Sequence, residues 1–191
     1  MRLATKLVIL CGLAALSMCG CEPRSETRST GSSTDQTTSS ASPMMTVATA
    51  TLTPTQGHDV KGTVTFTKVD NGVRVVADIT GLTPGEHGFH VHEKGDCSAP
   101  DGSSAGGHFN PTGMPHGGPD SEKHHIGDLG NLTADASGKA TLDRVFTFLE
   151  LSGTNSIVGC GLVVHQGADD LTSQPSGDAG ARVACGVIEL K

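Results

Sequence analysis

Aromatic residues are nearly absent from this chain of 191 residues, which has no tryptophan, no tyrosine and only five phenylalanines. The hydrophobic core must therefore be built mainly from Val, Ile, Leu and Ala. A convincing amphipathic helix is also missing. Glycine, by contrast, occurs 26 times and proline 9 times, which is typical of many turns between short elements. The length allows one domain with accessory segments, and these features favour an all-β domain.

Positive charge is scarce as well. The chain has 13 Lys and Arg against 20 Asp and Glu, a formal net charge of −7, and its basic residues form no run. A protein that binds nucleic acid through a dominant basic face needs clustered Lys and Arg to neutralise phosphates. The sequence therefore excludes that class of protein.

The apolar run near the start of the chain extends only from Leu7 to Leu16 and follows Arg2 and Lys6. It is too short to span a hydrocarbon core of about 30 Å and has the layout of a secretory signal. We therefore predict a signal peptide over residues 1–20 and an exported protein.

The end of this signal reads LSMCGC and resembles a bacterial lipoprotein cleavage site with Cys21 as the acylated residue. Met18 and Cys19 stand where such sites more often have Leu and a small residue, so ordinary signal cleavage nearby is the alternative. Residues 21–45 are rich in Ser and Thr, as in a flexible linker. A linker after a lipid anchor predicts a protein of the periplasm or cell envelope, attached to the membrane through Cys21.

From residue 46 onward, short runs alternate apolar and polar residues. VTFT at 64–67 and VRVVADI at 73–79 flank an Asp-Asn-Gly turn, the pattern of a β-hairpin. Further strands are predicted at 46–53, 87–92, 126–132, 139–146, 159–165 and 182–190. Eight short strands predict an eight-stranded antiparallel Greek-key sandwich or flattened barrel. Segments 94–125 and 167–180 are then two long loops, and loops of such length are usually functional.

Three histidines gather in the segment HGFHVH at residues 87–92. Because residues two apart in a strand share a face, His90 and His92 project together, while Phe89 and Val91 point to the opposite side. His87 faces away from the pair. Taken alone, two imidazoles on one strand face fit a metal site and a pair of surface histidines about equally well.

The long loop and the later strands add more metal-ligating side chains. These are His108, His116, His124, His125, Asp128 and His165. So many nitrogen and oxygen ligands exceed the need of one ion and suggest two. All-histidine coordination suits redox-active copper, whereas three histidines with one carboxylate suit a closed zinc site.

Six segments then carry a family resemblance: GEHGFHVHEKGDC, SAGGHFNP, HGGP, HIGDLGN, LVVHQGADD and GARVACGVI. Their joint occurrence in this order closely resembles the copper/zinc superoxide dismutases across residues 46–191. The resemblance implies an enzyme that dismutates superoxide to oxygen and hydrogen peroxide by alternating Cu(II) and Cu(I). It also implies one copper and one zinc per chain, and protection of the envelope or extracellular space. A non-catalytic copper-binding module and a metal-free structural domain are the alternatives.

Carried over residue by residue, the resemblance implies two metal sites that share His108. The implied copper ligands are His90, His92, His108 and His165, and the implied zinc ligands are His108, His116, His125 and Asp128. The family's H-x-G-D spacing selects His125 over His124. The shared imidazole would bridge the metals and take up a proton when copper is reduced, so His108 is also a candidate catalytic residue.

The resemblance further implies roles for residues that bind no metal. Asp169 would hydrogen-bond one ligand of each metal, and His87 would tie its strand to nearby backbone. Arg182 would attract and orient the anionic substrate, superoxide, as a second catalytic residue. Cys97 and Cys185 would form a disulfide, as suits an exported protein.

Some positions depart from the family pattern or stay without a role. Lys94 stands where many dimeric relatives have an apolar interface residue, which predicts a monomer or a homodimer with a different interface. Residues 170–181 contain no lysine, which predicts weaker steering of the substrate or steering from elsewhere. Cys160 is either a buried or interface thiol or, if exposed, a site for an intermolecular bridge. His58 is expected in an exposed loop.

Overall fold

The structure is a computed structural model that describes residues 45–191. The predicted signal peptide, Cys21 and nearly all of the predicted linker over residues 21–45 lie outside the described residues. Between residues 45 and 191, no helix is long and apolar enough to cross a membrane.

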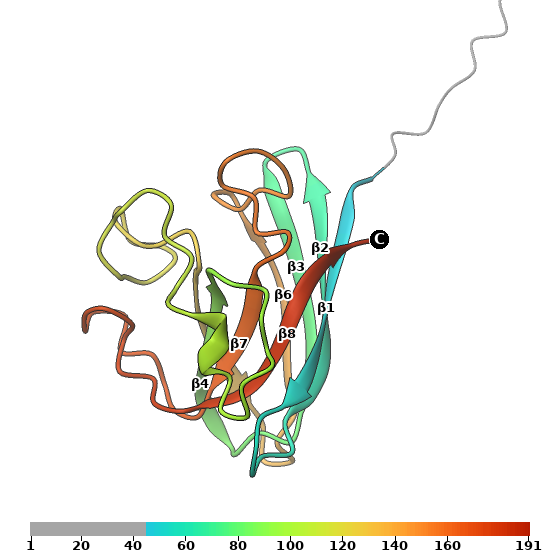
Figure 1. Cartoon of the computed structure of the whole chain (residues 1–191), viewed down its shortest axis with the longest axis vertical. Helices are drawn as coiled ribbons and strands as arrows, with labels where there is room; N and C mark the ends of the chain where they lie inside the picture. Colours follow the sequence, from blue (N-terminus) through green and yellow to red (C-terminus); the bar gives the residue numbers. More distant parts are fainter. Residues whose placement is uncertain (1–44) are drawn as a thin grey trace, which may run out of the picture. The chain divides into compact units, whose positions relative to one another are not determined.

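Eight antiparallel strands form a closed barrel in the order β1-β2-β3-β6-β5-β4-β7-β8 (Figure 1). They are β1 (Val47–Pro54), β2 (Lys61–Val69), β3 (Gly72–Thr80), β4 (Gly85–His92), β5 (Asp128–Ala134), β6 (Ala140–Phe146), β7 (Gly161–His165) and β8 (Arg182–Leu190), with a 3-10 helix, η1 (Ser103–Ala105), between β4 and β5. The neighbours β3–β6 and β4–β7 are not consecutive in the chain, which makes the connectivity a Greek key. The predicted all-β fold is confirmed.

The β2–β3 hairpin shows how the local sequence sets the register. Val69 pairs with Gly72 across the two turn residues Asp70 and Asn71, and Gly72 has φ 143°. A Cβ atom at this position would lie 2.2 Å from the carbonyl oxygen of Phe146, so only glycine fits. From there Val75, Ala77 and Ile79 point inward in strict alternation.

The barrel interior buries three of the five phenylalanines of the chain. Phe66 from β2, Phe89 from β4 and Phe146 from β6 are at most 1% exposed and join one aliphatic core. Burial of each such side chain is worth about 1.5–3 kcal/mol. The core therefore fixes β4, the strand whose other face carries His90 and His92.

Strand β4 is central to the arrangement because it pairs with β5 on one side and β7 on the other. His90 lies opposite Asp128 at the start of β5. His92 lies opposite Gly161 in β7 and also bridges to His108 in the following loop. These pairings draw together segments that are far apart in the sequence.

Two long connections carry most of the remaining polar residues. Residues 93–127 join β4 to β5, and residues 166–181 join β7 to β8. Figure 1 shows both of them extending from the barrel on the side of β4 and β7. The disulfide between Cys97 and Cys185, implied by the family resemblance, is present and attaches the first connection to β8.

Candidate metal centre

One group of four histidines lies where β4, β7 and the β4–β5 connection meet. His90, His92, His108 and His165 are buried, and each offers a ring nitrogen within 4.8 Å of the nitrogens of the others. The Nε2 atoms of His92 and His165 are 3.4 Å apart. The ring centroids of His90 and His108 are 4.1 Å apart.

Hydrogen bonds at the far side of each ring direct the other nitrogen into this group. His90 Nε2 donates to Asp169 Oδ2 at 2.8 Å, and His92 Nδ1 donates to the Gly106 carbonyl at 2.9 Å. His165 Nδ1 donates to the Gly180 carbonyl at 3.0 Å. Because these nitrogens hold the ring protons, the nitrogens inside the group keep free lone pairs.

A second group consists of His108, His116, His125 and Asp128. Asp128 Oδ1 lies 2.8 Å from His108 Nδ1, 3.1 Å from His116 Nδ1 and 3.3 Å from His125 Nδ1. Its other oxygen accepts hydrogen bonds from the backbone N–H groups of Gly117 and His125. The second group is therefore three imidazoles around one oriented carboxylate.

His108 belongs to both groups and turns a different nitrogen to each. Its Nδ1 faces Asp128, whereas its Nε2 is buried without a hydrogen-bond partner. His90 Nδ1 and His116 Nδ1 are the other buried side-chain nitrogens without a partner among residues 45–191. Buried polar atoms normally have partners, and metal ions would satisfy these three. Four imidazoles suit copper, and three imidazoles with a carboxylate suit zinc.

Burial keeps His90, His92 and His165 of the first group neutral. Desolvation lowers the pKa of His90 to about 4, that of His165 to about 3 and that of His92 to about 2. Imidazoles with such pKa values are unprotonated at neutral pH. Their lone pairs are therefore available to a metal without competition from a proton.

In the second group the charged forms of His116 and Asp128 are favoured, whereas burial lowers the pKa of His125. Burial acts to lower the pKa of His116, but the carboxylates of Asp128 and Asp169 outweigh it and raise the pKa to about 9. For Asp128 itself, burial opposes the effect of the adjacent His108 and His116 imidazoles, and its pKa still falls well below its usual range. A pair of ionised carboxylates in a buried site favours a cation there.

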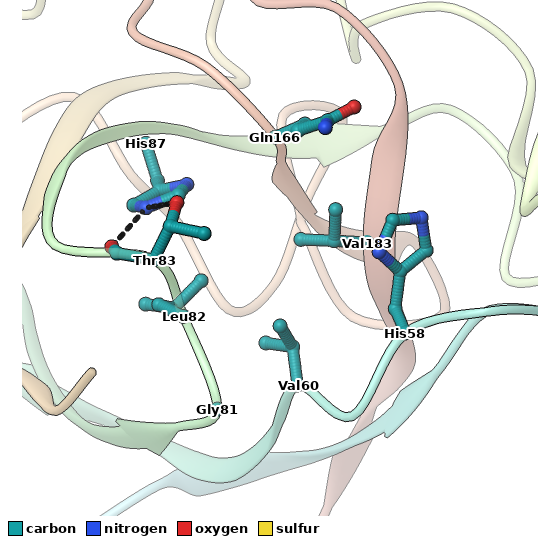
Figure 2. A pocket seen from close by; sticks show the side chains of 8 residues that line it. All are labelled: His58, Val60, Gly81, Leu82, Thr83, His87, Gln166 and Val183. Carbon is teal, nitrogen blue, oxygen red and sulfur yellow. Dashed lines mark hydrogen bonds between the residues drawn. The ribbon is translucent and has the colours of Figure 1, made fainter. Parts of the chain in front are cut away.

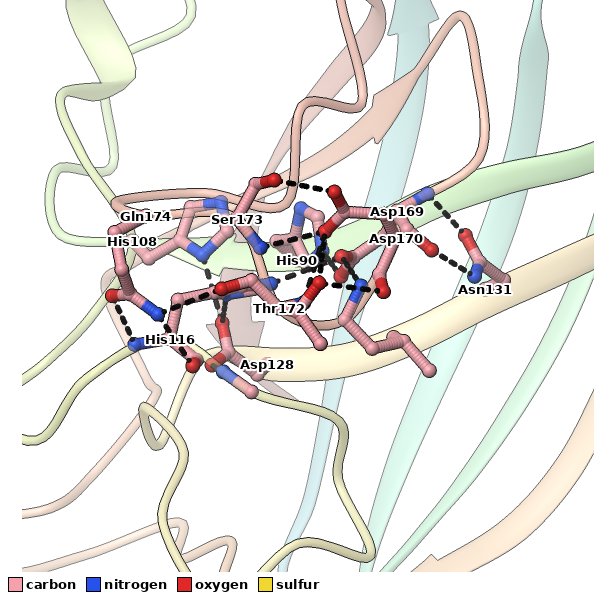
Figure 3. A network of polar contacts seen from close by, with 12 residues as sticks. His90, His108, His116, Asp128, Asn131, Asp169, Asp170, Thr172, Ser173 and Gln174 are labelled. Carbon is pink, nitrogen blue, oxygen red and sulfur yellow. Dashed lines mark hydrogen bonds and ion pairs between the residues drawn. The ribbon is translucent and has the colours of Figure 1, made fainter.

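Asp169 joins the two groups through its two oxygens. Oδ2 accepts from His90 in the first group, and Oδ1 accepts from His116 in the second at 2.9 Å (Figure 3). Asp169 is 3% exposed. Its backbone is held by Asn131, whose Nδ2 donates to Asp169 O and whose Oδ1 accepts from Asp169 N, each at 2.8 Å. No role for Asn131 was predicted from the sequence, although this residue ends the motif HIGDLGN.

Arg182 lies beside the first group in a cavity of about 410 Å³. The cavity is lined by His92, Ser103, Gly106, Gly107, His108, His165, Pro175, Ser176 and Arg182. The guanidinium donates from Nη1 to the Gly102 carbonyl and from Nη2 to the Gly106 carbonyl, both at 2.6 Å. Burial lowers the pKa of Arg182 from its ordinary value, but arginine stays charged at any physiological pH. The cavity therefore carries a fixed positive charge next to histidines.

His87 belongs to neither metal-ligand group. Its Nδ1 lies 2.9 Å from the carbonyl oxygen of His165 and its Nε2 lies 2.8 Å from that of Thr83. Figure 2 shows its ring beside a small cavity that Val183 and His58 also line. His87 thus contacts the backbone of β7 at His165. His58 lies in the loop between β1 and β2, as predicted, but it is half-buried rather than exposed.

Two further residues are placed outside the ligand groups. His124 turns its Nδ1 to the carbonyl oxygen of His125 at 2.7 Å, and its ring lies 4.3 Å from that of Phe148. Cys160 is a free thiol, 6% exposed. Burial also raises the pKa of this thiol. Cys160 is therefore a buried thiol, and the alternative of an exposed site for an intermolecular bridge is wrong.

Comparisons with known proteins agree with the site. The family model for copper/zinc superoxide dismutase (SODC) matches residues 60–188. The chain is 47% identical over 141 residues to the extracellular superoxide dismutase [Cu-Zn] of Drosophila melanogaster, covering 69% of this chain and 77% of that protein. It is also 47% identical over 137 residues to the superoxide dismutase [Cu-Zn] of Paramecium bursaria Chlorella virus 1, covering 68% and 72%.

A solved structure shares the fold as well. The crystal structure of the clock protein EA4 superposes with a TM-score of 0.69 at 45% identity, covering 75% of this chain and 93% of that one. The family match spans most of the described residues, including both histidine groups and Arg182. The chain therefore belongs to the copper/zinc superoxide dismutase family.

Proposed function

We propose that this superoxide dismutase holds one copper ion between His90, His92, His108 and His165, and one zinc ion between His108, His116, His125 and Asp128. The observation that supports the assignment is the set of partnerless buried nitrogens. His90 Nδ1, His108 Nε2 and His116 Nδ1 have no hydrogen-bond partner, and all of them belong to the two groups.

Copper, when bound, supplies the alternation between Cu(II) and Cu(I) by which one superoxide is oxidised to oxygen and a second is reduced to hydrogen peroxide. Arg182 supplies the positive charge that attracts the superoxide anion into the cavity and orients it. The carbonyls of Gly102 and Gly106 hold the guanidinium in place. The otherwise acidic chain thus presents a local positive field at its site.

His108 is the residue that holds a proton for the product. Its Nε2 is buried without a partner and His108 lines the cavity beside Arg182, so this atom can accept a proton and later donate it to the peroxide. Its Nδ1 is directed at the second group by Asp128. The zinc ligands therefore orient the ring and set its basicity, while Asp169 fixes His90 and His116 in one network.

The protein is exported, because the Cys97–Cys185 disulfide suits an oxidising compartment. We further propose the periplasm or cell envelope as its location, with membrane attachment through an acylated Cys21. Lys94 is exposed, and a charged residue there disfavours an apolar contact. A homodimer, if formed, would therefore use an interface other than the apolar one that many dimeric relatives form at the position of Lys94.

The ligand assignment is tested by metal analysis of two variants. His165→Ala should lose copper and keep zinc. His116→Ala should lose zinc before it loses copper. His165→Ala should also nearly abolish superoxide decay. Full copper content and normal activity in His165→Ala would overturn the copper assignment, and full zinc content in His116→Ala would overturn the zinc assignment.

A further inference from the structure

The connection between β7 and β8 lacks lysine, yet it makes close polar contacts with the second histidine group. Gln174 in this connection reaches His116 in the β4–β5 connection with both atoms of its amide (Figure 3). Its Oε1 accepts from His116 N at 2.8 Å, and its Nε2 donates to His116 O at 2.9 Å. The same Nε2 also donates to Thr172 O at 3.1 Å.

This double contact supplies what the backbone of His116 otherwise lacks. His116 is 4% exposed, and within residues 45–191 its backbone N–H and C=O make no hydrogen bond to another backbone group. A buried backbone group without a partner carries its full desolvation cost. The amide of Gln174 therefore fixes the main chain of a residue that lies outside regular secondary structure.

The ring of His116 is held from the same connection. Asp169 accepts from His116 Nε2, and Asp169 and Gln174 are both part of the β7–β8 connection. This segment is closed on itself by hydrogen bonds from Asp170 N to Gly177 O and from Gly177 N to Ser173 O. One compact loop thus holds the main chain and one ring nitrogen of His116, which leaves Nδ1 to face the second group.

We infer that Gln174 is a positioning residue for zinc, which fixes His116 so that Nδ1 stays directed at the metal and zinc leaves slowly. The inference rests on the proposed assignment of His116 as a zinc ligand. It also gives the lysine-free connection a role, because its polar residues hold the zinc site together. Partners that orient a metal ligand typically change metal affinity about 10–100-fold when they are removed.

The test compares Gln174→Ala with two other variants in the full metal-loaded protein. Gln174→Glu keeps an acceptor for His116 N but replaces the donor by an anionic oxygen that faces two carbonyl oxygens. Gln166→Ala is the matched control, because Gln166 is an exposed glutamine of the same connection with no side-chain hydrogen bond in the described part of the chain. Zinc transfer to a chromogenic chelator is timed for each.

We expect zinc transfer to be about tenfold faster in Gln174→Ala and at least as fast in Gln174→Glu, with Gln166→Ala at the wild-type rate. With Co(II) in place of zinc, the visible absorption band should shift in Gln174→Ala and stay unchanged in Gln166→Ala. A transfer rate within twofold of wild type in Gln174→Ala would overturn the inference. An equal fall in thermal midpoint for metal-free and metal-loaded Gln174→Ala would also overturn it, because Gln174 would then stabilise only the fold.

His116→Ala separates this inference from the assignment on which it rests. If His116→Ala keeps its zinc, the ligand assignment itself is wrong. If His116→Ala loses zinc while Gln174→Ala releases it at the wild-type rate, only the role of Gln174 is wrong.

Discussion

His92 and Arg182 donate hydrogen bonds to the same acceptor, the carbonyl oxygen of Gly106, at 2.9 Å and 2.6 Å. An imidazole of the first histidine group and the charge beside it are thereby fixed to one point of the β4–β5 connection. The position of the guanidinium is thus coupled to the geometry of the metal site. Any change that moves this segment should affect substrate attraction as well as metal binding.

Replacing the charge at Arg182 should slow the reaction without removing the metals. We expect Arg182→Gln to lower the rate constant for superoxide decay at least about tenfold, with copper and zinc contents unchanged. The rate should also lose much of its dependence on ionic strength, because screening acts on the steering charge. Pulse radiolysis at several salt concentrations measures both effects.

Arg74→Gln is the control for this change. It removes the same charge from β3, where Arg74 pairs with Asp143 on the exposed surface, and it should leave the rate unaltered. Equal losses in the two variants would mean that only net charge matters.

Removing the disulfide should reduce both stability and activity. Cys97→Ala releases the start of the β4–β5 connection from β8, at a cost of about 2–4 kcal/mol in free energy of unfolding. Activity should fall because the carbonyls of Gly102 and Gly106, which hold Arg182, lie in the released segment. Cys160→Ala is the control, since this thiol is free. Denaturant unfolding and the superoxide assay on both variants check this, and an unchanged midpoint in Cys97→Ala would contradict it.

The lack of space for a side chain at Gly177 predicts that a substitution there weakens zinc binding. A Cβ atom there would lie 1.8 Å from Asp169 Oδ1 and 2.7 Å from His116 Nε2. Gly177→Ala should therefore separate this pair and weaken zinc binding by about tenfold or more. Gly113→Ala is the matched control. Gly113 has a φ of 65°, similar to that of Gly177, but a Cβ atom there would meet no other atom within 4 Å. Competition with a zinc chelator measures both variants, and equal affinities would contradict the prediction.

Acid should destabilise the metal-free protein. Folding lowers the pKa values of His90, His92 and His165 from 6.5 to about 4, 2 and 3. The unfolded chain therefore binds more protons below pH 6.5, and the free energy of unfolding falls as the pH drops toward these values. His116, whose pKa is raised to about 9, acts oppositely, since its contribution is lost as the pH rises through 9.

Three groups with lowered pKa values outweigh one with a raised pKa, so the metal-free protein should be less stable at about pH 4.5 than at about pH 7. Urea unfolding at the two pH values measures the difference. A higher midpoint at the lower pH would show that the imidazoles are not buried in neutral form.

Much of the fold could be predicted from the alternation of apolar and polar residues and from the turn residues. Alternation predicted β3 within a residue at each end, and the Asn-Gly turn located its hairpin. The predicted strand 126–132 is displaced by two residues, because β5 begins only at Asp128, where it pairs with His90. Ile126 is apolar and buried but precedes the ladder, so its hydrophobicity misplaced the boundary.

The contacts that hold the site were harder to predict than its candidate metal ligands. Asn131 and Gln174 act on backbone atoms of residues 38 and 58 positions away, and no local pattern marks such pairs. The Gly106 carbonyl offers no side chain to recognise at all. Their roles follow from the way the two long connections pack, which only the tertiary structure reveals.

We propose that the two histidine groups together form one catalytic copper and zinc centre. Elemental analysis of the purified protein, combined with a superoxide assay on the same sample, tests it most directly. We expect about one copper and one zinc per chain, and rapid superoxide decay that is lost on chelation and restored by adding both metals. Bound copper and zinc without superoxide decay would contradict it and would favour a copper-binding module instead.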